Sequence, residues 1–391
     1  MNGIAGFPKG DRLTAGTRPD LPPSLARALE WLKPRLDEPV KLDDLAAAAG
    51  VRPRTLEAHF KQHLGATPIG WVRQVRLART RQQLLEAEPD ANVTDIATAN
   101  GFTELGRFSA QYREAFGELP SQTLKASRGC GAYEDEVNDE AVRLSWSAIA
   151  AAFTVAPEHN RAALDDAERA QELAPRYALP KAIAAWCLGQ RAAHGFGTTL
   201  HEDRAQSLKL ANEAVQLAPN DALVLSLSGG ALTLARKLTE ADRLIERSLA
   251  MEPWSAPGWI RRAWLSAYQG DNDDAVREMQ MTLRVMPFEP VRHLACIGMG
   301  CAHFGAGRYE QAARWVQSGL ASVPDSYWAG RVLVAAEALS GALTEARREA
   351  LDLLHKDGNL TVASARTAWP FTPAFMERLG DGLTLAGVPR A

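Results

Sequence analysis

The chain has 391 residues, of which 46% are hydrophobic and 23% charged, an ordinary globular composition that excludes collagen-like and wholly disordered chains. Its longest run without a charge or a proline, residues 293–307, has 15 residues, whereas a membrane-spanning helix needs roughly 20. Four cysteines are too few for a disulfide framework, and residues 1–20 lack the apolar core of a secretory signal. These features predict a soluble, reduced, cytoplasmic protein.

The net charge of −3 is distributed unevenly along the chain. Residues 21–128 hold 15 basic and 13 acidic side chains, whereas the following residues hold 26 basic and 32 acidic ones. Five of the seven residues from Glu134 to Glu140 are acidic and follow a glycine-containing stretch, which is typical of a linker. We therefore expect a disordered lead, a front domain, an acidic linker and a rear domain at residues 1–20, 21–128, 129–140 and 141–391.

Two segments of the front domain have the pattern of a helix-turn-helix. In residues 41–60, the small Ala46 allows two helices to cross closely, and Gly50 occupies the turn, where a left-handed backbone disfavours other residues. Residues 93–108 repeat this pattern, with Gly101 at the turn. The two segments predict two helix-turn-helix units in succession.

The segment between them, residues 68–85, has the apolar spacing of a long helix. Its spacing places Arg73, Arg76, Arg79 and Arg81 around the helix, so the four cannot form one stripe facing DNA phosphates. We expect at least two of them to be solvated or paired inside the domain. Thr94 is predicted to cap the helix that follows.

Residues 25–127 resemble the AraC/XylS-type DNA-binding domain. The phrases that carry the resemblance are Phe60–Gly65–Pro68, Arg76-Leu77-Ala78, Leu84-Leu85, Ile96-Ala97, Gly101-Phe102 and Phe108–Tyr112–Phe116-Gly117–Pro120. The resemblance implies a rigid central helix and two recognition helices, at residues 52–63 and 103–115, that enter successive major grooves of double-stranded DNA.

The resemblance also implies which side chains meet DNA. Base-facing positions would be held by Arg54, Glu57 and Ala58 in the first recognition helix and by Leu105, Gly106, Ser109 and Ala110 in the second. Arg54 can make a two-pronged bond to guanine, and Glu57 can accept from the cytosine amino group. The base-facing positions of the second helix have few side chains that can form hydrogen bonds, so this helix is expected to contribute phosphate contacts and shape fit. Lys61, Arg107 and Arg113 are the phosphate candidates, and Arg52 and Thr55 complete the predicted DNA-binding set.

The rear domain repeats with a period near 34 residues. Prolines recur at positions 175, 219, 253, 287 and 324, at spacings of 44, 34, 34 and 37 residues. This period resembles the tetratricopeptide repeat, so we expect five or six helical hairpins between Leu144 and His355 that stack into a superhelix. The spacing of 44 predicts an inserted loop at residues 195–203. The predicted fold class is therefore all-α, a double helix-turn-helix domain followed by a tetratricopeptide-like α-solenoid.

An apolar stripe is predicted on the concave surface of this solenoid. Its members are Ile260, Trp264, Ile297, Cys301 and Phe304. Such a stripe can bind a protein or peptide partner, or it can be covered by the final segment, residues 366–385. The sequence leaves both alternatives open.

Four potential zinc ligands, His293, Cys296, Cys301 and His303, lie close together in the sequence. Cys296 and His303 would share a helix face but stand about 10.5 Å apart along its axis, too far for one metal ion. No phosphate-binding loop, nucleophile elbow or paired carboxylates occur, so we expect neither a cofactor nor enzyme activity. The sequence predicts a sequence-specific transcription regulator whose repeats bind a partner or effector; the alternative is an interaction scaffold that binds DNA only non-specifically.

Overall fold

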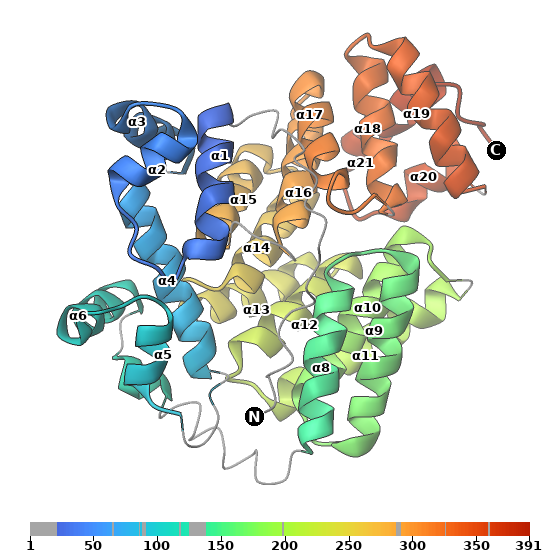
Figure 1. Ribbon diagram of the computed structural model, residues 1–391. Coiled ribbons are helices and arrows are strands. Elements are labelled where there is room, and N and C mark those ends of the chain that lie inside the picture. Colours follow the sequence, from blue (N-terminus) through green and yellow to red (C-terminus); the bar gives the residue numbers. More distant parts are fainter. Residues whose placement is uncertain are drawn as a thin grey trace.

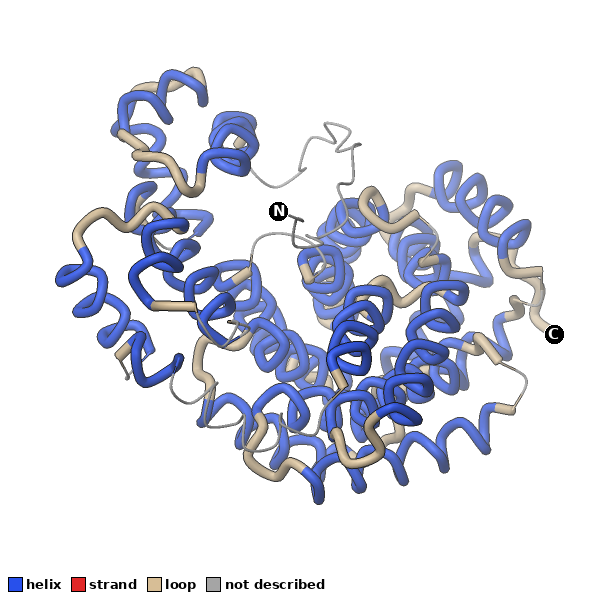
Figure 2. The backbone as a smooth tube through the Cα atoms, turned by 60° about the horizontal axis from the view of Figure 1, so that its bottom comes forward, coloured by secondary structure: helices blue, strands red, loops and turns tan. Residues whose placement is uncertain are grey.

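The computed structural model describes residues 22–391 except 65, 86, 88–90, 117, 118, 125–137, 198, 287–290, 325 and 359. The described residues form helices and connecting loops, and none of them is in a strand (Figures 1 and 2). The predicted lead, residues 1–20, and most of the predicted acidic linker lie outside the described residues.

The front part of the chain consists of short helices around one long helix, α4 (Figure 1). In chain order these are α1 (Pro23–Leu32), the 3-10 turn η1 (Lys33–Arg35), α2 (Leu42–Ala49), α3 (Pro53–Leu64), α4 (Pro68–Leu85), α5 (Val93–Ala99) and α6 (Leu105–Phe116). Helices α2 and α3 form the first helix-turn-helix unit, and α5 and α6 form the second. The predicted recognition helices are thus α3 and α6, each within two residues of the expected start.

Helix α4 contributes to two separate hydrophobic cores. Near its start, Trp71, Val72 and Val75 pack with the buried side chains of α1, α2 and α3. Further along, Leu77 and Leu84 pack with the aromatic side chains of the second unit. Because one helix completes both cores, each unit is anchored to the same rigid rod.

Both helix-turn-helix turns contain a glycine with a positive φ. Gly50 has φ +68° and Gly101 has φ +79°, a region that glycine adopts at little cost. Gly101 is also sterically confined, because a Cβ at this position would lie 2.7 Å from the carbonyl oxygen of Asp37. The cap predicted at Thr94 is wrong by two residues: the side chain of Asn92 accepts from the backbone N–H of Asp95, one turn into α5.

The rear part contains six antiparallel helix pairs within the described residues, followed by two final helices (Figure 1). The pairs are α8 (Asp139–Ala152) with α9 (Pro157–Leu173), α10 (Ala178–His194) with α11 (Leu200–Leu217), α12 (Ala222–Leu234) with α13 (Leu238–Met251), α14 (Ala256–Gln269) with α15 (Asn272–Val285), α16 (Arg292–Gly305) with α17 (Tyr309–Leu320), and α18 (Tyr327–Leu339) with α19 (Leu343–Lys356). The last helices are α20 (Val362–Ala368) and α21 (Pro373–Leu385).

The first helix of each pair packs on the first helix of the next, from α10 through α12, α14 and α16 to α18. The long proline spacing does not come from a long loop at residues 195–203, because α11 already begins at Leu200. Instead, α10 and α11 have 17 and 18 residues, whereas α12 and α13 have 13 and 14. The greater length of α10 and α11 therefore accounts for most of the difference between the proline spacing of 44 residues and the usual spacing of 34.

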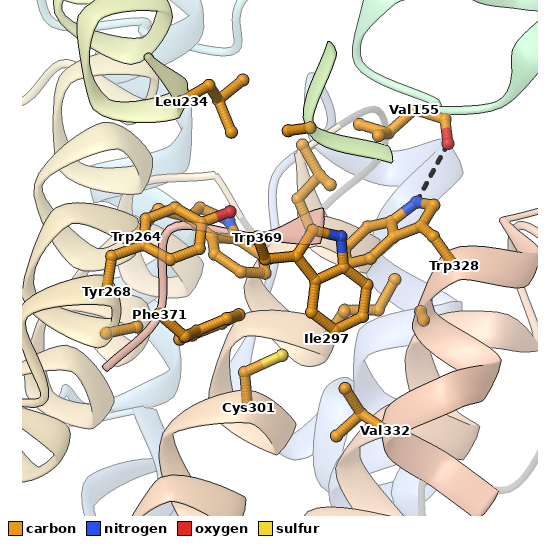
Figure 3. Packing of buried hydrophobic residues seen from close by; sticks show 14 of the residues in the cluster. Val155, Leu234, Trp264, Tyr268, Ile297, Cys301, Trp328, Val332, Trp369 and Phe371 are labelled. Atoms are coloured by element: carbon orange, nitrogen blue, oxygen red, sulfur yellow. Dashed lines mark hydrogen bonds between the residues drawn. The ribbon is translucent and has the colours of Figure 1, made fainter. Parts of the chain in front are cut away.

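The inner face of the solenoid is filled rather than open. The turn after α8 reaches across it, where the carbonyl of Val155 accepts from Trp328 Nε1 at 3.0 Å (Figure 3). The segment between α20 and α21 enters from the other end, where Trp369 Nε1 donates to His194 Nδ1 at 3.1 Å. Figure 3 shows the rings of Trp264, Tyr268, Trp328, Trp369 and Phe371 gathered in this interior.

A pair of glycine substitutions tests the turn of the second unit. We expect Gly101→Ala to destabilise the front domain by more than about 1–2 kcal/mol, because an alanine with positive φ is strained and its Cβ would collide with the Asp37 carbonyl. Gly106→Ala is the control: Gly106 is exposed in α6 with nothing near its missing Cβ, so this change should stabilise by up to about 0.5–1 kcal/mol. Hydrogen exchange of peptides from residues 93–116 in the full chain measures both effects, and equal protection in the two variants would contradict the steric argument.

Candidate nucleic-acid interface

Helix α3 presents a polar, mainly basic outer face. Leu56 and Phe60 are fully buried, and the Phe60 ring packs edge-on against Trp71 of α4 with ring centroids 6.0 Å apart. The predicted DNA-facing residues lie on the other side of the helix: Arg52, Arg54, Thr55, Ala58 and Lys61 are exposed, and Glu57 is half-buried. The buried pair thus fixes the rotation of α3 so that this set faces solvent.

Helix α6 is held in the same way but is less polar at its exposed side. Phe108 and Tyr112 are buried, and the Tyr112 hydroxyl donates to the hydroxyl of Thr123 at 2.9 Å. The predicted set on this helix is exposed at Leu105, Gly106, Arg107, Ala110 and Arg113 and half-buried at Ser109. Leu105 is a large apolar side chain with 37% of its surface exposed.

The two recognition helices differ in charge. The outward side chains on and directly before α3 include three cations, Arg52, Arg54 and Lys61, and one anion, Glu57. On and beside α6, Arg107 and Arg113 are offset by Glu104 and Glu114, and Arg107 Nη1 lies 3.9 Å from Glu104 Oε2. An anionic surface such as a phosphate backbone is therefore attracted mainly to α3.

Arg76 of α4 links the two units. Its Nε donates to the carbonyl of Leu36 at 2.6 Å and its Nη2 donates to the carbonyl of Glu38, both in the segment that leads into α2. Its Nη1 donates to the carbonyl of Gly101, in the turn of the second unit, at 3.0 Å. Burial lowers the pKa of Arg76 from its ordinary value, and the nearby carboxylate of Asp37 opposes this shift. One guanidinium group thus connects both units to the central helix.

The other arginines of α4 are not equivalent to Arg76. The guanidinium of Arg81 lies over the ring of Phe116 at 5.0 Å, inside the second unit. Arg73 and Arg79 are exposed. As the spacing indicated, the four arginines do not form one phosphate-facing stripe, and two of them serve the domain's own structure.

The predicted concave stripe is not an open surface. Ile260, Ile297, Cys301 and Phe304 are 0% exposed and Trp264 is 7% exposed. The ring of Phe304 packs on Phe375 of α21 at 5.0 Å, and Trp264 packs on Trp328 at 6.0 Å. Of the two alternatives that the sequence left open, this burial favours the second, in which the stripe is covered by the solenoid and its final segment rather than exposed for a partner.

The cluster of possible zinc ligands on α16 is occupied by other contacts. His293 donates from Nε2 to the carbonyl of Phe153 at 2.8 Å, and His303 Nδ1 accepts from Arg308 Nε at 2.8 Å. Within the described part of the chain, no three His, Cys, Asp or Glu side chains are grouped closely enough to hold a metal ion. Nor does any helix described here combine the length and the apolar character needed to cross a membrane.

Residues 45–126 match the family described as "Helix-turn-helix domain". The chain is 42% identical over 106 residues to the "XylDLEGF operon transcriptional activator" of Pseudomonas putida, a match that covers 26% of this chain and 32% of that protein. The chain thus spans about a third of this curated relative, and the similarity concerns the front domain.

Two solved structures are also similar to the chain. A transcriptional regulator with an AraC-type DNA-binding domain from Chromobacterium violaceum is 33% identical, with 27% of this chain and 92% of that chain covered and a TM-score of 0.25. A tetratricopeptide repeat protein from Parabacteroides merdae is 12% identical, with 63% and 98% covered and a TM-score of 0.35. The front domain is an AraC/XylS-type helix-turn-helix domain, and it is joined to a tetratricopeptide-like helical solenoid.

Replacement of Arg76 tests the link between the two units. We expect Arg76→Met to destabilise the front domain by at least about 2 kcal/mol, because three carbonyls lose a charged donor. Arg79→Met, on the same helix but exposed, should change stability by less than about 0.5 kcal/mol. Hydrogen exchange of front-domain peptides in the full chain gives both values, and a similar small effect of the two substitutions would show that Arg76 does not hold the units together.

Proposed function

We propose that this protein is a sequence-specific, DNA-binding transcription regulator in which α3 reads bases and α6 docks on the DNA backbone. The observation that carries the proposal is the exposed Arg54 on a recognition helix whose opposite side is locked into the core by Leu56 and Phe60. We take residues 21–128 as the DNA-binding unit and residues 141–391 as the regulatory unit of a cytoplasmic protein without catalytic activity.

Sequence readout on this proposal is concentrated in the first unit. Arg54 offers the planar pair of donors that matches the O6 and N7 acceptors of guanine, and Glu57 offers an acceptor for the cytosine amino group. The adjacent Ala58 is small and exposed, so it allows the helix to approach the groove closely. Lys61 and Arg52 would contact flanking phosphates, which position the helix without reading sequence.

The second unit would contribute little direct readout. Leu105, Gly106 and Ala110 have no side-chain hydrogen-bonding group, and Ser109 is half-buried. Leu105 could touch a thymine methyl group, which is a contact of low specificity. We therefore infer that α6 selects DNA through its shape, while Arg107 and Arg113 position the helix by contacting phosphates.

The solenoid would supply the regulatory input. Because the five predicted concave positions are buried, a protein or peptide partner would have to bind the outer faces or the ends of the solenoid. Helix α4 approaches α15, and a change in the solenoid would reach the central helix of the DNA-binding domain through this contact. The proposed function is tested by selection of bound fragments from genomic DNA with the full chain; recovery of no common sequence would favour the non-specific scaffold.

Arg54→Ala tests the assignment of base readout. We expect the substitution to reduce the binding free energy by about 1–3 kcal/mol and to relax the base preference at one position of the selected site. Lys61→Ala should instead weaken specific and random DNA alike, because a phosphate contact carries no sequence information. Binding-site selection with each variant measures the preference, and an unchanged consensus with Arg54→Ala would place the readout on another residue.

The charge difference between the helices predicts unequal salt effects. Replacing both Arg52 and Lys61 with alanine should reduce the slope of log affinity against log salt by about 2, because two phosphate contacts and their released counterions are lost. Replacing both Arg107 and Arg113 should reduce the slope less, because Glu104 already lies 3.9 Å from Arg107. Titration of the full chain with one DNA duplex at several salt concentrations gives the two slopes; a larger effect of the α6 pair would reverse the proposed roles.

A further inference from the structure

A small cavity lies at the inner face of the solenoid. It has a volume of about 40 Å³, and its lining includes Trp186, Leu234, Arg261, Trp264, Tyr268 and Trp328. A single water molecule needs about 10–15 Å³ of such space, so the cavity has room for a few non-hydrogen atoms. The side chains that line it are mainly aromatic and aliphatic, but one lining residue, Arg261, is charged.

That charge is the guanidinium of Arg261, in the middle of α14. The residue is only 5% exposed, and its guanidinium stacks on the ring of Trp186 at 3.6 Å. Among the described residues, neither its Nε nor its Nη2 has a hydrogen-bond acceptor. Burial lowers the pKa of Arg261 to about 9, so the group remains mostly protonated at neutral pH. A buried cation without an anion is energetically unfavourable, and this one lines an open space.

The surrounding backbone makes room for this arginine. A Cβ on Gly230 of α12 would lie 2.8 Å from Arg261 Cδ and 2.9 Å from its Nε. Alanine at position 230 would therefore push the guanidinium away from its present place. The lack of a side chain at Gly230 of α12 therefore leaves the space that the Arg261 side chain occupies.

The other polar groups at the cavity are donors or are already bonded. Burial raises the pKa of Tyr268, so its hydroxyl keeps its proton and can donate. Burial lowers the pKa of His194 to about 3, and its Nδ1 accepts from Trp369, so the neutral ring carries its proton on Nε2. The Gln190 amide oxygen accepts from Asn160, and the Thr233 hydroxyl donates to the carbonyl of Gly229. None of the described residues that line the cavity is Asp or Glu, so the chemistry of the cavity favours an anion.

We infer that this cavity binds a small organic carboxylate, about the size of acetate or propionate, whose oxygens pair with Arg261 while its apolar end lies against Leu234, Trp264 and Trp328. The planar guanidinium fork matches a carboxylate, and the apolar walls favour a carboxylate with a short hydrocarbon end over an inorganic ion. This inference rests on the proposed function in one respect: it makes a small carboxylate the effector of the regulator. Binding of the carboxylate to the cavity can nevertheless be measured without DNA.

The test uses the full chain and two probes of nearly equal shape. Sodium propionate replaces sodium chloride at constant ionic strength, and neutral propionamide is added in parallel. Tryptophan emission reports binding, because Trp186, Trp264 and Trp328 line the cavity, and the Tm reports stabilisation through ligand linkage. We expect a saturable change and a rise in Tm with propionate and no change with propionamide. An equal response to both probes, or none to either, would overturn the inference.

Variants then locate the site. Arg261→Met should weaken propionate binding at least about tenfold through loss of charged hydrogen bonds, and Arg261→Lys should weaken it less because the charge remains. Gly230→Ala should also weaken binding, because it displaces the guanidinium without removing it. Arg243→Met, an exposed arginine on α13, is the matched control and should bind propionate normally. Unchanged binding in both Arg261→Lys and Gly230→Ala would overturn the assignment even if Arg261→Met does not fold.

The Tm in propionate-free buffer separates a ligand-binding role from a structural one. If Arg261 serves binding, Arg261→Met should leave that Tm unchanged or raise it, because an unpaired buried charge is removed. A lower Tm together with unchanged propionate binding would assign Arg261 to packing on Trp186 and overturn the inference. Retention of DNA by the same samples is measured separately, so a loss of DNA binding tests the proposed function and leaves the propionate result independent.

Discussion

The helix pairs of this chain share one constraint, which is that a pair cannot bury its apolar face alone. In the front domain, Trp71 and Val75 of α4 cover one pair while Leu77 and Leu84 cover the other. In the solenoid, each pair is covered by the next, from α10 to α18. Because this packing fixes the orientation of each helix, it also fixes the direction in which the exposed polar side chains of that helix point.

The front domain shows how burial and polar contacts divide this work. Apolar packing sets the rotation of α3 and α6 about their own axes, so that one side of each faces solvent. Helix α4 packs against the first unit near its start and against the second unit further along. Arg76 adds directional bonds to carbonyls of both units, and such bonds weaken quickly when the geometry changes. Arg76 thus adds to the packing of α4 in fixing the spacing of the recognition helices, and it need not touch DNA to do so.

Sequence periodicity was enough to predict the helices, the repeats and the two glycine turns, because these depend on local backbone conformation and on regular apolar spacing. The contacts that complete the site were not predictable in this way. Arg76 sits between the buried Val75 and Leu77, which hints at an inward position, but its acceptors lie 25–40 residues away. Arg261 and Arg262 are adjacent, and only the tertiary structure shows that the first is buried while the second pairs with Asp242 and Glu278. Likewise, the rings that cover Trp264 and Phe304 come from segments far along the chain.

The crossing contacts inside the solenoid alter the way in which this repeat domain should fold. An open solenoid is stabilised by neighbouring repeats, so it can gain or lose units and can unfold from its ends. Here His293 bonds to a carbonyl 140 residues earlier, and Trp369 bonds to a histidine 175 residues earlier. Contacts between residues so far apart in the sequence form slowly during folding. Once formed, they connect early helix pairs of the solenoid to late ones, so these pairs should fold and unfold together. We therefore expect the domain to unfold as one body rather than from its ends, and we expect deletion of one helix pair to misalign the groups that make these long-range bonds.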